Sequence, residues 1–360
     1  SVVPPVSDWV VSGQPRLRIG GPQAKGPYAL RDVSGVAALS DGSIAVALLN
    51  AAEIRIFSAR GVHIRTIGGK GYGQGMFESL WEVYAIADTI IGVNNFGVGQ
   101  AFTRDGRFVR IIPRAIVGGY QVKRKGFFPD GGSFGMRVDP RAPDGSGRAT
   151  QMLTIARIDP NGRGVAIGEY PARQAVYRSG QWADGVIFGP RFTATIVGDA
   201  ICIGYPDRFS FKCLNRDGST RAAVQRGGWP RRLVTASNRD RYFAAFDSAN
   251  PLPRGRRAQE DARRSTVFAS ELPAFGRFLA SSDHMLWISP PAFEDATLSL
   301  TPIPSSNSPW SVYSTDGKWV ADAKIPAGVR LMAVTSKDAI GLRKDLPGYE
   351  QITVHAILKR

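Results

Sequence analysis

A segment near the N-terminus recurs about 48 residues later, and this repeat constrains the fold more than any single residue does. Each copy has an apolar residue before two glycines, then a glycine close to an aromatic residue, then a short apolar run. The first copy is Ile19-Gly20-Gly21, Gly26-Pro27-Tyr28 and Val36 to Leu39, and the second is Ile67-Gly68-Gly69, Gly75-Met76-Phe77 and Val83 to Ile86. Repeats of roughly 40 to 50 residues are typical of propellers and solenoids, whose units are too small to bury an apolar face alone.

The composition is compatible with such an array. The chain has 360 residues, of which 43% are hydrophobic, and this is enough for one large core or a ring of smaller ones. It also contains 41 glycines and 24 prolines, which punctuate the sequence as turns do between short strands. We therefore expect many short strands and few long helices.

The first unit predicts four antiparallel strands joined by hairpins, which is the content of one propeller blade. The expected strands are Val36 to Leu39, Ser43 to Leu48, Glu53 to Ser58 and His63 to Ile67. The turn before the fourth strand ends in a glycine, which supplies the positive φ of a tight hairpin. Equivalent turns end at Gly61, Gly106, Gly218 and Gly317, with a weaker version at Gly162.

The last unit offers only three strands, at Leu331 to Thr335, Ala339 to Leu342 and Gln351 to Leu358. Residues 16–19 precede two glycines as residues 65–67 do, so we expect them to supply the fourth strand and close the ring. This predicts an all-β, six-bladed β-propeller. It forms a single domain over residues 16–360, after an N-terminal extension at 1–15 and with a helical insertion in the fifth blade at about 251–272.

This arrangement of glycine pairs, apolar strands and Asp-Gly turns resembles the NHL-type and TolB-like six-bladed β-propellers. The resemblance covers roughly residues 16–358 and is poorest between residues 116 and 172. It implies a ring of blades around a central channel. Propellers of this superfamily include lactonases, calcium-dependent esterases, sugar-binding proteins and protein-docking modules, so the resemblance does not imply one activity.

The calcium enzymes of that superfamily hold the ion at the starts of the inner strands, with carboxylates and amides. The corresponding positions here are expected at Ser34-Gly35, Trp81-Glu82, Gly135-Met136, Arg191-Phe192, Arg231-Arg232 and Arg277-Phe278. One carboxylate among arginines is a poor cation site, because calcium needs several converging oxygens. The sequence therefore predicts no metal and no cofactor, and an anion suits the channel better.

Other motifs favour structural roles. Gly131-Gly132-Ser133-Phe134-Gly135 matches the hydrolase nucleophile elbow, but the flanking residues predict a hairpin turn rather than a strand-to-helix turn. Residues 68–75 are rich in glycine but lack the Lys-Ser/Thr pair of a phosphate-binding loop. The histidines, His63, His284 and His355, each fall in an expected strand far from the others. We predict no catalytic residues.

The two cysteines lie in two expected strands that flank a turn at Pro206-Asp207-Arg208. A hairpin centred between Asp207 and Arg208 places Cys202 opposite Cys213, at a separation that suits a disulfide. Two free buried thiols are the alternative. A disulfide implies an oxidising compartment. The chain starts at Ser1 without a methionine and has no apolar run of about 18 residues, so we expect an exported, extracytoplasmic protein peripheral to a membrane.

The formal net charge is +16, which favours anionic partners, although compositional drift in an arginine-rich proteome is an alternative explanation. The basic residues are mostly scattered, and this argues against nucleic acid as a ligand. An acidic lipid surface or a protein partner remains open.

A candidate partner-binding face follows from the loops between blades, which should emerge on one side of the ring. Arginine and aromatic residues gathered on such a face are typical of protein interfaces. The candidates are Tyr72, Phe77, Trp81, Glu82, Trp229, Arg231, Arg232 and Phe293. The alternative is that the two tryptophans wedge between blades.

These observations predict a non-catalytic docking or scaffold module, an extrinsic subunit on the periplasmic face of a respiratory or photosynthetic membrane complex. One alternative is a lactonase-like or esterase-like hydrolase that uses the channel. Another is a binding protein for an anionic glycan or small ligand.

Overall fold

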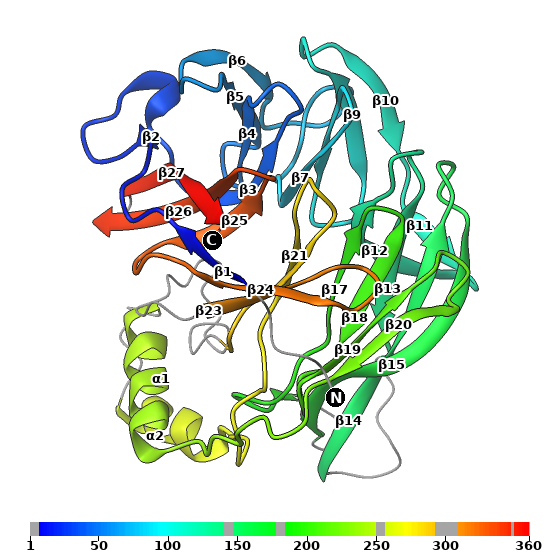
Figure 1. Ribbon diagram of the computed structural model, residues 1–360, viewed down its shortest axis with the longest axis vertical. Helices are drawn as coiled ribbons and strands as arrows, with labels where there is room; N and C mark the ends of the chain where they lie inside the picture. The colour runs from blue at the N-terminus through cyan, green and yellow to red at the C-terminus, as the bar shows by residue number, and fades with distance from the viewer. Residues whose placement is uncertain are drawn as a thin grey trace.

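The computed structural model describes residues 7–139, 147–177, 184–249, 256–291, 309–346 and 349–359. The chain is a β-propeller: antiparallel sheets follow one another in chain order around a common centre (Figure 1). The innermost strands contact their neighbours all round this centre, β3 with β7, β7 with β12, β12 with β17, β17 with β21, β21 with β25 and β25 with β3.

The first two sheets have the expected regular form. The first runs β3-β4-β5-β6, with β3 at Val33–Ala38, β4 at Ile44–Leu48, β5 at Glu53–Phe57 and β6 at His63–Gly68. The second runs β7-β8-β9-β10, with β7 at Glu82–Ile86, β8 at Thr89–Val93, β9 at Gly99–Thr103 and β10 at Phe108–Ile112. The strands expected in the first unit therefore occur within three residues of their predicted ends.

The third sheet is the irregular one. Its strands are β11 at Ala115–Val117, β12 at Tyr120–Phe127, β13 at Ser133–Val138, β14 at Gly147–Ile158, β15 at Gly164–Tyr177 and β16 at Asp184–Gly185. The hairpin of β14 and β15 is the longest in the described chain and carries two register shifts. β14 and β15 have 12 and 14 residues and are the longest described strands, so this segment differs most from the four-stranded repeats.

The fourth sheet contains β17 at Thr193–Val197, β18 at Ala200–Gly204, β19 at Ser210–Leu214 and β20 at Thr220–Gln225. The following strands are β21 at Phe278–Ala280, β22 at Leu286–Ile288, β23 at Pro309–Tyr313, β24 at Trp319–Lys324, β25 at Arg330–Val334, β26 at Asp338–Leu346 and β27 at Tyr349–Lys359. They form two groups, β21 to β24 and β25 to β27.

The N-terminal residues join these two groups. Strand β2 (Leu17–Gly20) pairs antiparallel with β27, so residues 17–20 add a strand to the C-terminal sheet. Strand β1 (Ser7–Val11) pairs parallel with β24 on one side and antiparallel with β27 on the other. Because β1 pairs with both, the two groups merge into one continuous sheet. The extension at 1–15 thus contains a strand that links two neighbouring sheets.

Two helices interrupt the chain between β20 and β21. They are α1 at Ala236–Ala249 and α2 at Arg256–Ser265, and a short 3-10 helix η1 occupies Gly26–Tyr28. The sequence indicated a helix near α2 but gave no expectation of α1. Aromatic residues of α1, including Tyr242, pack on Phe188 and Phe268 in a small separate cluster. Neither α1 nor α2 is long and apolar enough to cross a membrane.

The main cores lie between neighbouring sheets. Every residue of β4 is buried, and its side chains alternate between two clusters. Ile44, Val46 and Leu48 pack toward the C-terminal sheet, whereas Ala45 and Ala47 pack toward the second sheet. A strand buried on both faces needs no polar alternation, and this explains the continuous apolar run in the sequence.

The repeated turn glycines pack against the preceding sheet. All of them have positive φ, from +79° at Gly61 to +90° at Gly218. A Cβ at Gly61 would lie 2.6 Å from Leu17 Cδ1 of β2, and one at Gly317 would lie 2.8 Å from Val224 Cγ2 of β20. Glycine is therefore required at these turns for two reasons: the positive φ, and the close approach of a side chain from the preceding sheet. The turn of the first sheet thus packs on β2 in the same way that the turn between β23 and β24 packs on β20.

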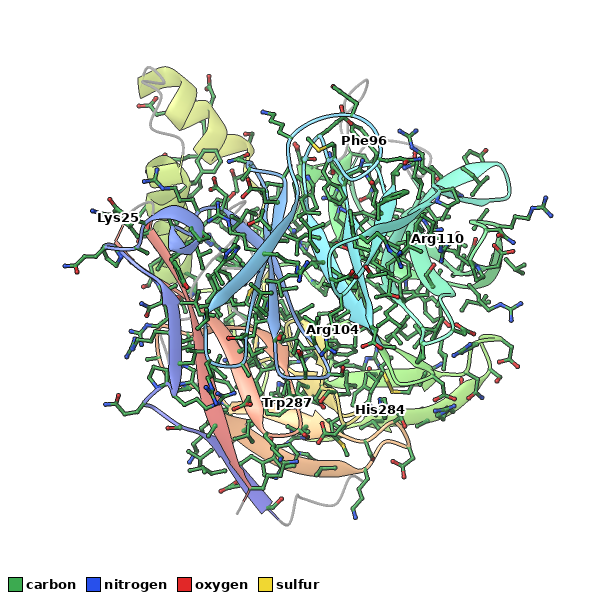
Figure 2. The ribbon with its side chains drawn as sticks, turned by 90° about the horizontal axis from the view of Figure 1, so that it is seen from above. Lys25, Phe96, Arg104, Arg110, His284 and Trp287 are labelled. Carbon is green, nitrogen blue, oxygen red and sulfur yellow. A yellow bond between two sulfur atoms is a disulfide. The ribbon has the colours of Figure 1, made fainter. Side chains whose placement is uncertain are left out.

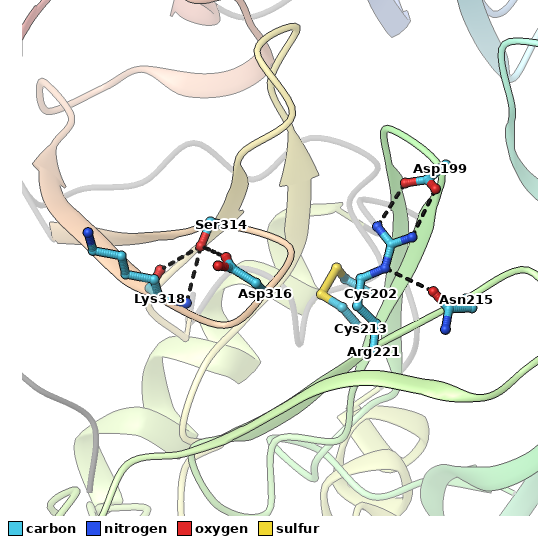
Figure 3. Close-up of a disulfide and its surroundings, with 8 residues drawn as sticks. All are labelled: Asp199, Cys202, Cys213, Asn215, Arg221, Ser314, Asp316 and Lys318. Atoms are coloured by element: carbon cyan, nitrogen blue, oxygen red, sulfur yellow. Dashed lines mark hydrogen bonds and ion pairs between the residues drawn. A yellow bond between two sulfur atoms is a disulfide. The ribbon is translucent and has the colours of Figure 1, made fainter.

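The predicted disulfide joins Cys202 of β18 to Cys213 of β19, and the two residues are direct partners in the ladder (Figure 3). Both are fully buried. Beside the disulfide, the Arg221 guanidinium donates two hydrogen bonds to the Asp199 carboxylate, each 2.8 Å long, and one to Asn215. This bidentate contact ties the outermost strand β20 to the turn between β17 and β18.

Candidate docking surface

The connections that lead into the innermost strands lie on one face, which we call the helix-bearing face because α1 and α2 belong to one of them. A turn between the second and third strands of a sheet reaches the same face, since β8 ends where β7 begins. Figure 2 shows the helices projecting on the same side as Phe96, which lies in the turn between β8 and β9.

Tyr72 is one of the predicted residues that the structure exposes. It lies in the glycine-rich connection between β6 and β7, and 86% of its surface is accessible. The loop itself is held firmly, because the buried Gln100 amide accepts a hydrogen bond from Gly75 N at 2.6 Å and donates one to Gly73 O at 3.1 Å. A hydrogen bond to Glu78 raises the pKa of the Tyr72 phenol. The loop thus presents an aromatic ring on a fixed backbone.

Phe77 is a correction to the expected face. Its side chain is only 3% exposed and packs in the core between the first two sheets, with its ring 6.1 Å from that of Phe102. The reason is the backbone pairing of Phe77 with the start of the same loop. Phe77 N donates a hydrogen bond to Gly69 O, and this contact directs the Phe77 side chain toward the core. Phe77 anchors the Tyr72 loop and cannot reach a partner.

Trp81 and Glu82 are half-buried where β7 begins. Glu82 accepts a hydrogen bond from the Tyr84 phenol and lies 3.6 Å from Lys125 Nζ of β12. The Lys123 ammonium lies 5.5 Å from the centre of the Trp81 ring, and burial, together with Lys125, lowers its pKa. Glu82 is thus one carboxylate beside two lysines. The net positive charge favours anions rather than cations where β7 meets β12 at the centre of the ring.

Two of the positions expected at the starts of inner strands lie elsewhere. The innermost strand of the third sheet is β12, not the strand of Gly135 and Met136, which is β13. Arg231 and Arg232 precede α1 rather than an inner strand. The extra strand β11 before β12 and the helices before β21 change where the inner strands fall along the chain. The spacing of the repeats in the sequence could not show these insertions.

Trp229 packs between sheets, as the alternative interpretation of the tryptophans held. Its ring centre lies 4.6 Å from that of Phe209 and 4.8 Å from the Arg226 guanidinium. Arg226 also lies 3.6 Å above Trp319 and donates a hydrogen bond to Ser311. The neighbouring Tyr313 has its pKa raised to about 12, chiefly by burial. Trp229 therefore belongs to a cluster of aromatic rings around Arg226 that joins the fourth sheet to the strands β21 to β24.

Arg231 and Arg232 are exposed, and with Leu233 they form a short segment that we call the Arg-Leu segment (residues 231–233). Its backbone is tied down: Leu272 N donates to Arg232 O at 2.7 Å, and Leu233 forms a bridge with Glu271. The Arg231 guanidinium is 83% exposed, although it pairs with Glu271 at 3.2 Å, and Leu233 is 68% exposed. Leu233 was not among the predicted residues.

Phe293, the last predicted residue, lies outside the described residues. Two exposed aromatic residues were missed, Phe96 and Tyr120, which are 46% and 59% exposed. Each lies beside a turn glycine, and a search for aromatic residues next to glycine outside the apolar runs could have found them.

The remaining motifs have structural surroundings. Ser133 begins β13 after a hairpin turn, is buried and accepts a hydrogen bond from Arg124 Nε at 3.0 Å. His63 and His355 lie in strands as expected, but His284 lies in the turn between β21 and β22 with a φ of +59°. No cluster of three or more metal-ligating side chains occurs within the described residues.

No protein-family model matches the sequence, and no curated protein sequence is similar to it. Among solved structures, the chain is similar to a member of the DUF4221 family from Bacteroides vulgatus, with a TM-score of 0.54 and 11% identity over 98% of this chain and 99% of the other. It also matches regucalcin, a calcium-binding protein from Agrobacterium tumefaciens, with a TM-score of 0.44 and 10% identity over 96% and 95% of the two chains. The first of these likenesses shows a shared fold along nearly the whole chain and nothing about activity.

Proposed function

We propose that this protein is a six-bladed propeller of the NHL-type or TolB-like kind that acts as a non-catalytic docking module. In this proposal it binds to the extracytoplasmic side of a membrane protein complex. The strand groups support a count of six if β21 to β24 and β25 to β27 with β2 are taken as the last two blades. The helices α1 and α2 are then an insertion between the fourth and fifth blades.

The observation that carries the docking proposal is the Arg-Leu segment. A leucine that is 68% exposed stands directly after two exposed arginines, on backbone held by hydrogen bonds to residues 270–272. Arginine is enriched at binding hot spots, and a bulky apolar side chain gains most when a partner covers it. A fixed backbone lowers the entropy lost on binding. These properties suit a protein partner with an acidic, partly apolar surface.

The extracytoplasmic location is supported by the disulfide. Both cysteines are fully buried in the fourth sheet and directly opposed, so the bond belongs to the core of the fold. Structural disulfides of this kind persist mainly in oxidising compartments.

The test is affinity capture from membranes of the native organism solubilised in mild detergent, with tagged protein as bait and mass spectrometry as the readout. We expect a discrete set of membrane-complex subunits to be retained. Replacing Arg232 and Leu233 together by alanine should reduce their recovery at least tenfold, because truncating a hot-spot arginine typically costs about 2 kcal/mol or more.

The matched control replaces Arg60 and Val62 by alanine. These residues lie in the turn between β5 and β6, at the opposite end of the sheet, and Val62 is 58% exposed. The control removes the same charge and a similar apolar surface, so it should retain the partner. Equal loss in both variants, or no partner recovered by the wild-type protein, would contradict the docking proposal.

A further inference from the structure

Three exposed aromatic residues gather on the helix-bearing face of the second and third sheets. Within the described chain, Tyr72, Phe96 and Tyr120 are the aromatic residues among the large exposed apolar side chains, at 86%, 46% and 59%. They lie in the β6–β7 connection, in the β8–β9 turn and at the first residue of β12. Exposed aromatic rings that are restricted to one edge of a molecule indicate a contact surface.

Hydrogen bonds fix these residues relative to one another. Gln100 of β9 holds the Tyr72 loop, as described above, and β9 begins directly after the turn that carries Phe96. Gln121, next to Tyr120, donates a hydrogen bond from Nε2 to Phe96 O at 2.6 Å. The three rings are therefore presented on one connected framework.

Two arginines accompany the rings. The Arg114 guanidinium lies 5.6 Å from the centre of the Phe96 ring, and that of Arg137 lies 4.2 Å from the centre of the Tyr120 ring. Neither guanidinium pairs with a carboxylate among the described residues. Both charges thus remain available to an outside anion. We call Tyr72, Phe96, Tyr120, Arg114 and Arg137 the aromatic rim.

The backbone beside two of the rings projects from the surface. Gly73 and Gly75 near Tyr72, and Gly118 and Gly119 before Tyr120, have no other atoms within 4 Å of the position a Cβ would take, whereas Gly97 beside Phe96 lies near Gln121. A protein interface of standard size needs a continuous, well-packed patch. Separate projecting rings with adjacent cations suit the headgroup region of a bilayer, where tyrosine rings and arginine side chains are favourable.

We propose that the aromatic rim binds an anionic phospholipid surface. The three rings insert at the level of the headgroups, and Arg114 and Arg137 contact lipid phosphates. The net charge of +16 adds long-range attraction to such a surface. This inference extends the proposed peripheral location to a direct lipid contact, and it involves residues other than the Arg-Leu segment.

The experiment uses purified full-length protein and vesicles, without any protein partner. Co-sedimentation is compared between vesicles of phosphatidylcholine alone and vesicles that also contain phosphatidylglycerol. We expect binding to the anionic vesicles that weakens as salt is added, because salt screens the headgroup charge. The triple variant Tyr72→Ser, Phe96→Ser, Tyr120→Ser should weaken binding by about tenfold or more, since three apolar contacts are lost.

The control is the triple variant Val62→Ser, Ile64→Ser, Val109→Ser, at apolar residues outside the rim that are 58%, 46% and 51% exposed. It should bind as the wild-type protein does. Replacing Arg114 and Arg137 by glutamine should remove most of the preference for anionic vesicles. The Tyr72→Trp variant should show a larger blue shift and more quenching by brominated lipid than the wild-type protein, with its seven tryptophans, when vesicles are added.

Absence of binding to anionic vesicles by the wild-type protein would overturn the proposal. So would equal loss in the rim and control variants, or a Tyr72→Trp variant that brominated lipid quenches no more than it quenches the wild-type protein. Loss of the captured membrane complex by the rim variant, with vesicle binding intact, would make the rim a protein interface instead. Because the vesicles contain no protein, failure here leaves the test of the docking proposal unaffected.

Discussion

Single residues with the same sequence signature have different roles in this protein, and burial separates them. Tyr72 and Phe77 are two aromatic residues in one glycine-rich connection, yet one is 86% exposed and the other 3%. The hydrogen bonds of Gln100 and of Phe77 N decide which ring faces the core. Gln100 lies 25 residues away from the loop it holds, and no local pattern predicts that contact.

His355 is the residue whose titration should be visible in stability. It is fully buried in β27, where Nδ1–H donates to Ser12 O at 2.7 Å and Nε2 lies 3.0 Å from Thr353 Oγ1. Burial is the main cause that lowers the pKa of His355 below its ordinary value of 6.5. The unfolded chain therefore binds a proton at higher pH than the folded chain does.

The sign of the effect follows from this difference. The stability associated with neutral His355 is fully present above pH 6.5 and is lost as the pH falls through the lowered pKa of the folded state. Urea unfolding at a series of pH values should show a falling free energy of unfolding below pH 6.5. The His355→Gln variant should show a flatter profile in that range, and an unchanged slope would contradict the assignment.

At the scale of elements, hairpin register was the most predictable property. A hairpin centred between Asp207 and Arg208 places Cys202 of β18 opposite Cys213 of β19, and the structure has this pairing and the disulfide. A two-residue period and a tight turn determine register locally, so distant contacts are not needed. The helix α1 was not predicted, because its aromatic residues pack on Phe188 and Phe268 rather than on a repeat-like surface.

The disulfide should contribute measurably to stability. It closes a loop with a sequence separation of 11 residues, and cross-links of this length typically stabilise by about 2–4 kcal/mol. We expect the double variant Cys202→Ala, Cys213→Ala to lose about this much in denaturant unfolding. Wild-type protein unfolded under reducing conditions gives an independent measurement of the same loss. Stability unaffected by both treatments would show that the strand pairing alone holds this hairpin.

At the scale of the whole molecule, closure depends on both N-terminal strands. β2 pairs with β27, and β1 joins β27 to β24, so residues 7–20 connect the two ends of the chain and two neighbouring strand groups. The anchor of β1 is Trp9, which is 6% exposed, 5.7 Å from the Trp287 ring and 4.3 Å from Lys359 Nζ.

Trp9→Ala should therefore weaken closure. Removing a buried tryptophan typically costs about 3–5 kcal/mol, and here the loss should also release β1. Denaturant unfolding should show the lower free energy, and hydrogen exchange should become faster in β24 and β27. Leu358→Ala is the control, because Leu358 pairs with Val10 in the same strands but is 44% exposed and should cost little. Equal effects of the two substitutions would mean that Trp9 has no special role in closure.

The sequence by itself indicated the all-β class, the repeated hairpins, the opposed cysteines and a closing strand at residues 16–19, which the structure has at 17–20. These depend on short-range periodicity, turn glycines and a recurring unit, and such signals are local in the chain. Only the tertiary structure decided which loop residues are exposed. Phe77 and Trp229 pack inward, while Leu233, Phe96 and Tyr120 remain accessible. The physical reason is that exposure depends on the neighbouring sheet, and the residues that cover a side chain lie far from it in the sequence.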